Sequence, residues 1–264
     1  MPFTLAHPAA SIPLTRRGLL LSALVVGSLA PDFSYFVTLD TNQNFGHTLA
    51  GLFWFCLPMG LLVLWLFHGL VKRPLLALLP QGFQLRLAGA TAQPFSFFPS
   101  ERTWKIVLSL LVGSITHLVW DSFTHPDGWI VEHFQVFDTI VFRWAGSDFQ
   151  IYTLLQYASS LVGMALIGWW VWRWYRQARV FSGTVIYPIS TWQKWLITAG
   201  LFGLAFGLGG WLCWQHSPMV DSLTTFKQLS AQLFVTGTSF LCVEFSIFGV
   251  IWKGWVEHEP QRAS

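Results

Sequence analysis

Two histidines and an aspartate recur at four-residue intervals in the stretch HLVWDSFTHPDGW: His117, Asp121 and His125. Residues four apart are neighbours on one face of an α-helix, so this spacing places the three side chains along one stripe. Imidazole and carboxylate groups together supply the nitrogen and oxygen ligands that zinc and similar divalent cations bind. The alternative is a hydrogen-bonded His–Asp pair in a wet interface without metal, and the spacing alone fits both.

The chain that carries these residues is unusually apolar. Of its 264 residues 53% are hydrophobic and 10% are charged, and the mean hydropathy is +0.52. A soluble domain carries about 25% charged residues, so this composition predicts a multi-pass membrane protein. The net charge of +3 is small, and no basic tract interleaved with aromatic residues is present. The sequence therefore does not favour a nucleic-acid partner.

Five runs are long and apolar enough to cross a bilayer, which requires about 20 residues. They lie near residues 48–71, 104–123, 150–172, 195–214 and 228–252. A sixth run, 18–36, is interrupted by the Pro31–Asp32 pair. The predicted fold is an all-α polytopic membrane helix bundle, with five long spans plus an amino-terminal helical hairpin. We expect one integral membrane domain over residues 1–264, divided into the hairpin (1–47), the spans that carry the core of the site (48–149) and the carboxy-terminal spans (150–264).

Three more residues of ligand type precede the HLVWDSFTHPDGW stretch: His7, Asp32 and His47. Taken singly, each fits a structural role, such as a helix start, a turn or an interfacial anchor. The predicted hairpin begins near His7, turns at Arg16 and Arg17, and returns to Asp32. An ionisable side chain within a membrane helix costs about 3 kcal/mol on insertion scales, so it is usually paired, hydrated or bound to a cation.

Lysine and arginine residues are distributed unevenly over the connections between the predicted spans. They gather in connections 72–105 and 173–194, and are nearly absent from connections 124–149 and 215–227. Positive residues are retained in the cytoplasm, so the first two connections and the carboxy terminus are predicted to be cytoplasmic. His47 and the segment 117–125 then lie together at the outer face of the membrane, which favours one shared site.

Four stretches of the chain, AHPAA, SLAPDF, GHTLAGLF and VGSITHLVWDSFTHPDGW, resemble a bacterial family of multi-pass membrane proteins catalogued as a domain of unknown function. The likeness runs through roughly the whole chain. That family is similar, more distantly, to the membrane-bound metal-dependent hydrolases. The order of ligand-type residues also resembles that of zinc-dependent phospholipase C, an all-helical enzyme with several metals in one cleft.

The resemblance implies a metal site with ligands from distant parts of the sequence. Carried over position by position, one metal would be held by four residues: Asp32, His47, His117 and Asp121. His7 would bind a neighbouring metal, with Asp121 as a bridge, and His125 would be a further ligand. The later His and Glu ligands of the phospholipases have no clear counterpart in this chain. The expected cofactor is a divalent metal, zinc, present as one or more ions.

These expectations favour a membrane-bound metal-dependent hydrolase that acts at the outer interface on a phosphoester or lipid head group, with membrane lipids as partners. The general base stays open: Asp127, Glu132, or no protein base beyond the metal. Two other classes also fit. The same residues would carry ions or protons in a transport protein, or would fix the hairpin through a bound metal in a scaffold protein. Glu244, within the last span, is a separate functional candidate because of its cost in a membrane.

Overall fold

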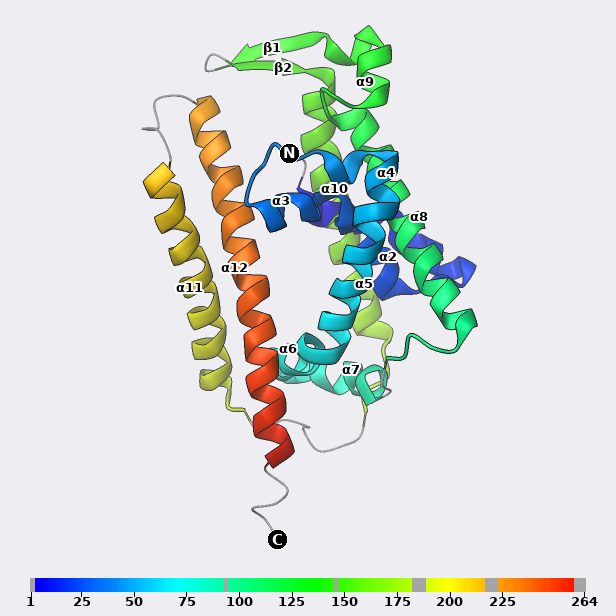
Figure 1. Ribbon diagram of the computed structural model, residues 1–264, viewed down its shortest axis with the longest axis vertical. Helices are drawn as coiled ribbons and strands as arrows, with labels where there is room; N and C mark the ends of the chain where they lie inside the picture. Colours follow the sequence, from blue (N-terminus) through cyan, green and yellow to red (C-terminus); the bar gives the residue numbers. More distant parts are fainter. Residues whose placement is uncertain (1–2, 93–94, 145–146, 182–188, 217–222, 259–264) are drawn as a thin grey trace.

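The computed structural model describes residues 3–92, 95–144, 147–181, 189–216 and 223–258, and it is almost entirely helical (Figure 1). Six helical stretches in this part of the chain are long and apolar enough to cross a membrane. They are Leu21–Thr38, Leu49–Leu78, Ser100–His133, Ile151–Gln177, Thr191–Gln215 and Thr224–Gly254. The prediction of an all-α polytopic membrane helix bundle is confirmed, and the interrupted sixth run proves long enough to count as a span.

The predicted amino-terminal hairpin is present, but its two arms are unequal. The first arm is short and consists of η1 (Thr4–Ala6), α1 (Pro8–Ser11) and η2 (Ile12–Arg17). It ends at Gly18, whose φ of 82° lies in the left-handed region that glycine adopts without strain. The second arm consists of α2 (Leu21–Leu29), η3 (Ala30–Asp32) and α3 (Phe33–Thr38). The helical path thus continues past Asp32, where the sequence predicted that it would stop.

The rest of the chain forms a series of longer helices with short elements between them. In order these are η4 (Phe45–His47), α4 (Leu49–Gly51), η5 (Leu52–Cys56), α5 (Leu57–Leu66), η6 (Phe67–Val71), α6 (Lys72–Leu78), α7 (Gln81–Ala92), α8 (Ser100–Thr124), α9 (Trp129–His133), η7 (Gln135–Asp138), β1 (Ile140–Trp144), β2 (Ser147–Gln150), α10 (Ile151–Gln177), α11 (Thr191–His216) and α12 (Leu223–His258). The segments α4 to α6 are continuous, with π-helical turns at η5 and η6.

Helices α2 and α8 pack against each other with their backbones almost in contact. A Cβ atom added to Gly27 would lie 2.3 Å from the carbonyl oxygen of Leu110, and one added to Gly113 would lie 2.5 Å from that of Leu24. Small residues allow this approach between membrane helices. The hydroxyl of Ser114 also donates a hydrogen bond across the interface to the carbonyl of Gly27, at 2.9 Å. The relative position of the two helices is therefore fixed.

An antiparallel pair of strands, β1 and β2, lies in the connection 124–149 and at its border with the next predicted span. Phe142 pairs with Phe149, and their rings stack with centroids 4.7 Å apart. The run IVFRW is rich in the β-branched and aromatic residues that favour strands, and the all-α prediction overlooked it. This hairpin and α9 form one end of the molecule (Figure 1).

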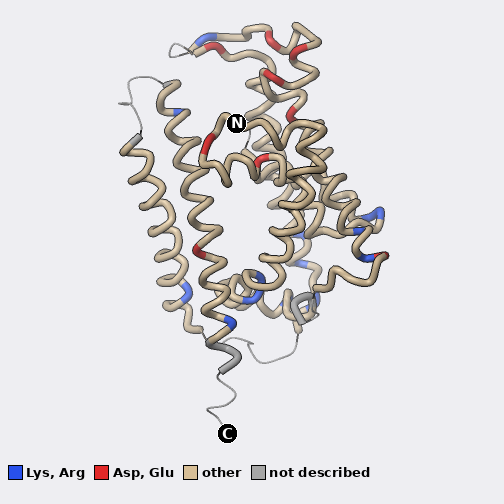
Figure 2. The backbone as a smooth tube through the Cα atoms, in the orientation of Figure 1, with Lys and Arg blue, Asp and Glu red and all other residues tan. Residues whose placement is uncertain are grey.

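The two ends of the bundle differ in charge. Figure 2 shows most Lys and Arg residues toward the end formed by α6, α7 and the carboxyl part of α12, and most Asp and Glu residues toward the end formed by β1, β2 and α9. The described parts of the two Lys- and Arg-rich connections thus lie at the same end, as the alternation of spans requires. Residues 259–264, the predicted cytoplasmic terminus, lie outside the described residues.

Candidate metal centre

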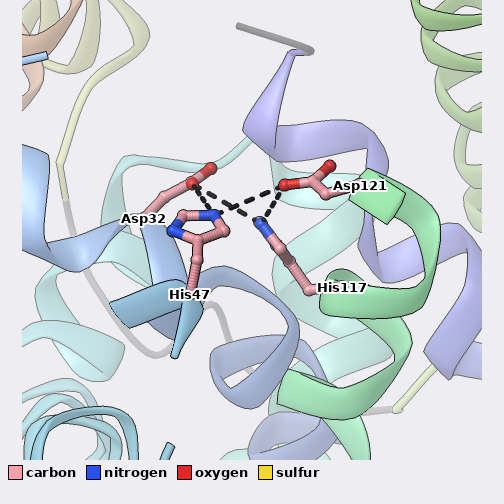
Figure 3. Close-up of side chains that lie close together, drawn as sticks. All are labelled: Asp32, His47, His117 and Asp121. Carbon is pink, nitrogen blue, oxygen red and sulfur yellow. Dashed lines mark ion pairs between the residues drawn. The ribbon is translucent and has the colours of Figure 1, made fainter. Parts of the chain in front are cut away.

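Four ligand-type side chains converge from three separate parts of the chain (Figure 3). Asp32 ends η3, His47 ends η4, and His117 and Asp121 lie one turn apart near the end of α8. One nitrogen or oxygen atom from each of the four lies within 4.8 Å of the corresponding atoms of the others. Three of these side chains are at most 9% exposed, and that of His47 is 21% exposed. This buried His/Asp group could hold a metal ion.

The separations within this group are those of ligands around a common centre. The Nε2 atom of His117 lies 2.9 Å from Oδ2 of Asp121 and 3.5 Å from Oδ1 of Asp32. The Nε2 atom of His47 lies 3.4 Å from each of the same two oxygens. Two donors that are each about 2.1 Å from a zinc ion, at bond angles between square and tetrahedral, are about 3.0–3.4 Å apart. The observed separations match that geometry.

The hydrogen bonds of His117 show which of its ring nitrogens is free. Its Nδ1 lies 2.8 Å from the carbonyl oxygen of Ser28, which only accepts hydrogen bonds, so Nδ1 carries a proton and donates it. In the neutral ring, Nε2 then presents a lone pair toward the carboxylates. This Nε2 atom is buried and makes no hydrogen bond among the described residues. A cation between the lone pair and the carboxylate oxygens would relieve the repulsion, and metal-bound histidines are held by this type of backbone contact.

The second oxygen of Asp121 faces two further histidines. Oδ1 lies 3.0 Å from Nε2 of His7 and 3.3 Å from Nδ1 of His125. Like His117, His7 directs its Nδ1 at a backbone carbonyl oxygen, that of Thr4 at 3.1 Å, but its Nε2 differs because it forms a hydrogen bond with Asp121 Oδ1. The two imidazole rings stack with centroids 3.8 Å apart. Asp121 therefore lies between two sets of nitrogen donors, one on each carboxylate oxygen.

His47 is positioned by a glycine that no other residue could replace without movement. A Cβ atom on Gly46 would lie 2.1 Å from the carbonyl oxygen of Pro31, so η4 touches the residue before Asp32. The thiol of Cys56 also donates to the carbonyl of Gly46 at 3.3 Å. Burial lowers the pKa of His47, but its hydrogen bonds to the carboxylates of Asp121 and Asp32 outweigh burial, and the net pKa is raised. The carboxylates thus attract a positive charge to this position.

An open cleft of about 790 Å³ lies over one side of the centre, and His47, Asp121 and His125 form part of its lining. Asp127 lines the same cleft, where its Oδ2 accepts a hydrogen bond from the side-chain amide of Asn44 at 3.2 Å. Glu132 is exposed on α9 and is not among the described lining residues. Of the two carboxylates considered from sequence as a general base, the structure brings only Asp127 to the cleft.

The remaining ionisable candidate, Glu244, lies on α12 away from the centre. Its two carboxylate oxygens are buried and have no hydrogen-bond partner among the described residues.

Some contacts near the centre could not be predicted from the residue types in the sequence. The carbonyls of Thr4 and Ser28 orient two ligand histidines, and a backbone contact leaves no signature in residue types. Lys227 lines the cleft from α12, and as an isolated lysine in a connection it gave no signal.

Comparison with known proteins gives one match. A family model described as a domain of unknown function (DUF4184) matches residues 1–250. No curated protein and no solved structure matches the chain. The matched range contains the whole hairpin and every side chain of the centre, but its description names no activity.

Proposed function

Because the chain belongs to the family described as a domain of unknown function, DUF4184, we propose its function from the site alone. The protein is a membrane-bound hydrolase that depends on divalent metal, zinc in this proposal, and cleaves a phosphoester in a lipid head group. It acts at the outer face of a bacterial inner membrane. The observation that supports this most strongly is the buried Nε2 of His117, which faces two carboxylates without a hydrogen bond.

The donor atoms form two adjacent groups that share Asp121. The first group is Asp32 Oδ1, His47 Nε2, His117 Nε2 and Asp121 Oδ2; the second is Asp121 Oδ1, His7 Nε2 and His125 Nδ1. Each group offers the nitrogen and oxygen donors that zinc accepts. Metal ions held by these residues would lower the pKa of a bound water and would stabilise the charge that develops on a phosphoryl group.

The cleft side chains can perform the proton transfers of phosphoester hydrolysis. In the proposed reaction, the oxygen of a water molecule forms a bond to phosphorus, and the bond from phosphorus to the leaving alcohol oxygen breaks. Asp127 accepts the proton that the water loses and returns it to the leaving oxygen. Asn44 positions Asp127 through the hydrogen bond to Oδ2. The products are an alcohol and a phosphate ester with one fewer ester bond, so atoms and charge balance.

Ion transport is the main alternative, and it predicts a path of ligand-type side chains through the bundle. Away from the centre, Glu244 lies within a described apolar span, and its carboxylate has no hydrogen-bond partner among the described residues. One isolated carboxylate does not connect the centre to the other end. The centre instead adjoins a cleft large enough for a ligand, since binding pockets are about 300–1,000 Å³. This favours catalysis over transport.

The test is metal content and phosphodiester turnover of the purified full-length protein. We expect zinc to co-purify with the wild type, and bis(4-nitrophenyl) phosphate to be hydrolysed in a reaction that chelator stops and zinc restores. The variants H117A and D32A should lose both metal and turnover. H68A is the matched control, because His68 also lies in a helical span but bonds Ser22 and stacks on Phe95. Equal, negligible metal in all four proteins would overturn the proposal.

A further inference from the structure

The cleft beside the candidate metal centre, here called the metal cleft, adjoins a second cavity. This cavity, here called the side pocket, has a volume of about 430 Å³ and lies between the amino-terminal segment, α3, α10 and α12. Three residues line both the side pocket and the metal cleft: Gln156, Tyr157 and Lys227. The two cavities therefore adjoin, and a ligand that passes these three side chains occupies both.

The side pocket has a lining of a different chemical kind from that of the metal cleft. Six of its twelve lining residues are apolar, four of them phenylalanines: Phe3, Phe36, Phe226, Ala231, Phe234 and Val235. The other six are the three shared residues and three small hydroxyl residues: Thr4, Ser160 and Ser230. The rings of Phe3 and Phe234 approach to 5.6 Å, so the amino-terminal segment closes one side. The metal cleft is lined largely by Asp, His, Asn, Gln, Thr and Tyr. A hydrocarbon chain fits the first surface, and a hydrated head group fits the second.

Lys227 lies where the two cavities meet, and its charge is uncompensated there. It is the one Lys or Arg among the described residues that line either cavity. Its ammonium lies 4.9 Å from the centroid of the Phe149 ring, and it forms no ion pair with a carboxylate in the described part of the chain. The nearby cleft carboxylate Asp148 is instead paired with Arg143, at 2.7 Å. An exposed ammonium between a polar and an apolar cavity suits the anionic end of an amphiphile.

We infer that the metal cleft and the side pocket together bind one anionic amphiphile of the phospholipid type, through its phosphate and one of its hydrocarbon chains. Its phosphate lies beside Lys227, with the head group toward Asp127 and the metal ligands, and one hydrocarbon chain fills the side pocket. Phe226 and Phe234 lie on α12, a helix long and apolar enough to cross a membrane, so the side pocket is lined by a segment of the kind that contacts hydrocarbon chains. As a statement about the substrate class, this inference rests on the proposed function. As a statement about binding, it does not require turnover.

The experiment is photo-crosslinking of the full-length protein in phosphatidylcholine nanodiscs. The probe is dodecyl phosphate with a diazirine near the end of its chain, and the labelled residues are mapped by mass spectrometry. We expect labels on the residues that line the side pocket, chiefly Phe3, Phe226 and Phe234. The same diazirine on dodecanol, which lacks the phosphate, should label these residues about tenfold less, as expected for loss of one charge-assisted contact.

Two variants with matched controls test the two halves of the ligand. A231F fills the side pocket and should reduce its labelling about tenfold, whereas A231S keeps a small side chain and should not. K227Q should reduce labelling by dodecyl phosphate to the level seen with dodecanol. K253Q, at the other end of α12, should leave labelling unchanged. Inorganic phosphate at the concentration of the probe should not compete, because it lacks the chain.

The outcomes separate this inference from the proposed function. Labels confined to the side pocket that respond to A231F and K227Q support the inference even if chelator has no effect and no phosphodiester is hydrolysed. Labels spread over all lipid-facing helices, or placed instead at Leu212 and Leu229 of the cavity between α11 and α12, overturn it. In that case metal-dependent turnover of a soluble phosphodiester would leave the proposed function standing.

Discussion

The helices that precede the β-hairpin and the three that follow it are equally apolar but differently packed. In Leu21–Thr38, 50% of the residues are buried, whereas 6% are buried in the most apolar stretch of Ile151–Gln177. Gly27 in α2 and Gly113 in α8 each touch the other helix's backbone, and Gly209 in α11 likewise touches Gly237 of α12, but Gly168 in α10 and Gly203 in α11 have no neighbouring atom within 4 Å. Every ligand-type side chain of the centre lies in the closely packed part. The ligand-type side chains thus lie in the part of the described chain with the largest buried fraction, whereas few residues in the apolar stretches of α10 to α12 are buried.

The largest expected effect breaks the close packing itself. G27A places a methyl group against the Leu110 carbonyl and should lower the free energy of unfolding by more than about 2 kcal/mol, since neither backbone can move away. G168A meets no atom within 4 Å and should raise it by about 0.5–1 kcal/mol, because alanine restricts the unfolded chain. Thermal unfolding followed by tryptophan fluorescence in detergent measures both. Equal shifts would contradict the difference in packing.

The next effect concerns the rate of phosphodiester hydrolysis in the cleft. Residues from the helices before and after the β-hairpin line this cleft. D127N should slow hydrolysis of bis(4-nitrophenyl) phosphate by about 10²–10⁴, the usual contribution of a general base, without loss of bound metal. T153A changes a side chain that lines the same cleft from α10 and should change the rate less than about threefold, because it makes no contact with the centre. The rates are measured at saturating zinc. A D127N rate within threefold of wild type removes Asp127 as the base.

A smaller effect tests whether the fixed backbone holds the ligands in place. G46A pushes η4 away from Pro31 and displaces His47, so zinc affinity should fall by about 10–100-fold, as for loss of a positioning contact. G207A in α11 meets no atom within 4 Å and should leave affinity unchanged. Competition with a chromogenic chelator gives both dissociation constants. Unchanged zinc affinity in G46A would show that His47 is not a ligand.

The smallest effect is a change in stoichiometry. H7A removes a donor from one oxygen of Asp121 only, so bound zinc should fall from about two ions to one per chain while the first group stays filled. E244Q changes the carboxylate on α12 that has no hydrogen-bond partner among the described residues, and it should leave the zinc content at two. Mass spectrometry of the intact protein counts the ions. A loss of zinc in E244Q would show that Glu244 on α12 contributes to ion binding, which favours transport.

The same comparison explains how much the sequence could predict. Composition and run length identify membrane helices, because a bilayer imposes one length and one polarity on every span. The clustering of Asp32, His47 and His117 was inferred from the topology and from a family resemblance, and the structure places these side chains together. It could not be derived from spacing within one helix. The residues lie on three elements, and their approach depends on where Gly27 and Gly46 allow backbones to meet.

Other features escaped prediction for a physical reason. The carbonyls of Thr4 and Ser28 fix two histidine rings through backbone atoms that every residue possesses, so residue type carries no information about them. The strands β1 and β2 fall in a short segment, where helical and strand patterns are hard to separate. The position of Lys227 between two adjoining cavities depends on segments that are far apart in the sequence, so no local pattern indicates it. Glu132, adjacent to His133 in sequence, is exposed on α9 and is not among the lining residues of the cleft that Asp127 lines.

The most direct test is the position of bound zinc. Crystals of the full-length protein grown with zinc would be measured on both sides of the zinc absorption edge, so that an anomalous difference map locates each ion. The account predicts one peak about 2.0–2.2 Å from His47 Nε2, His117 Nε2 and the oxygens of Asp32 and Asp121, with a second peak between His7 and the other oxygen of Asp121. Zinc found only elsewhere, with these side chains bonded to each other or to water, would contradict it.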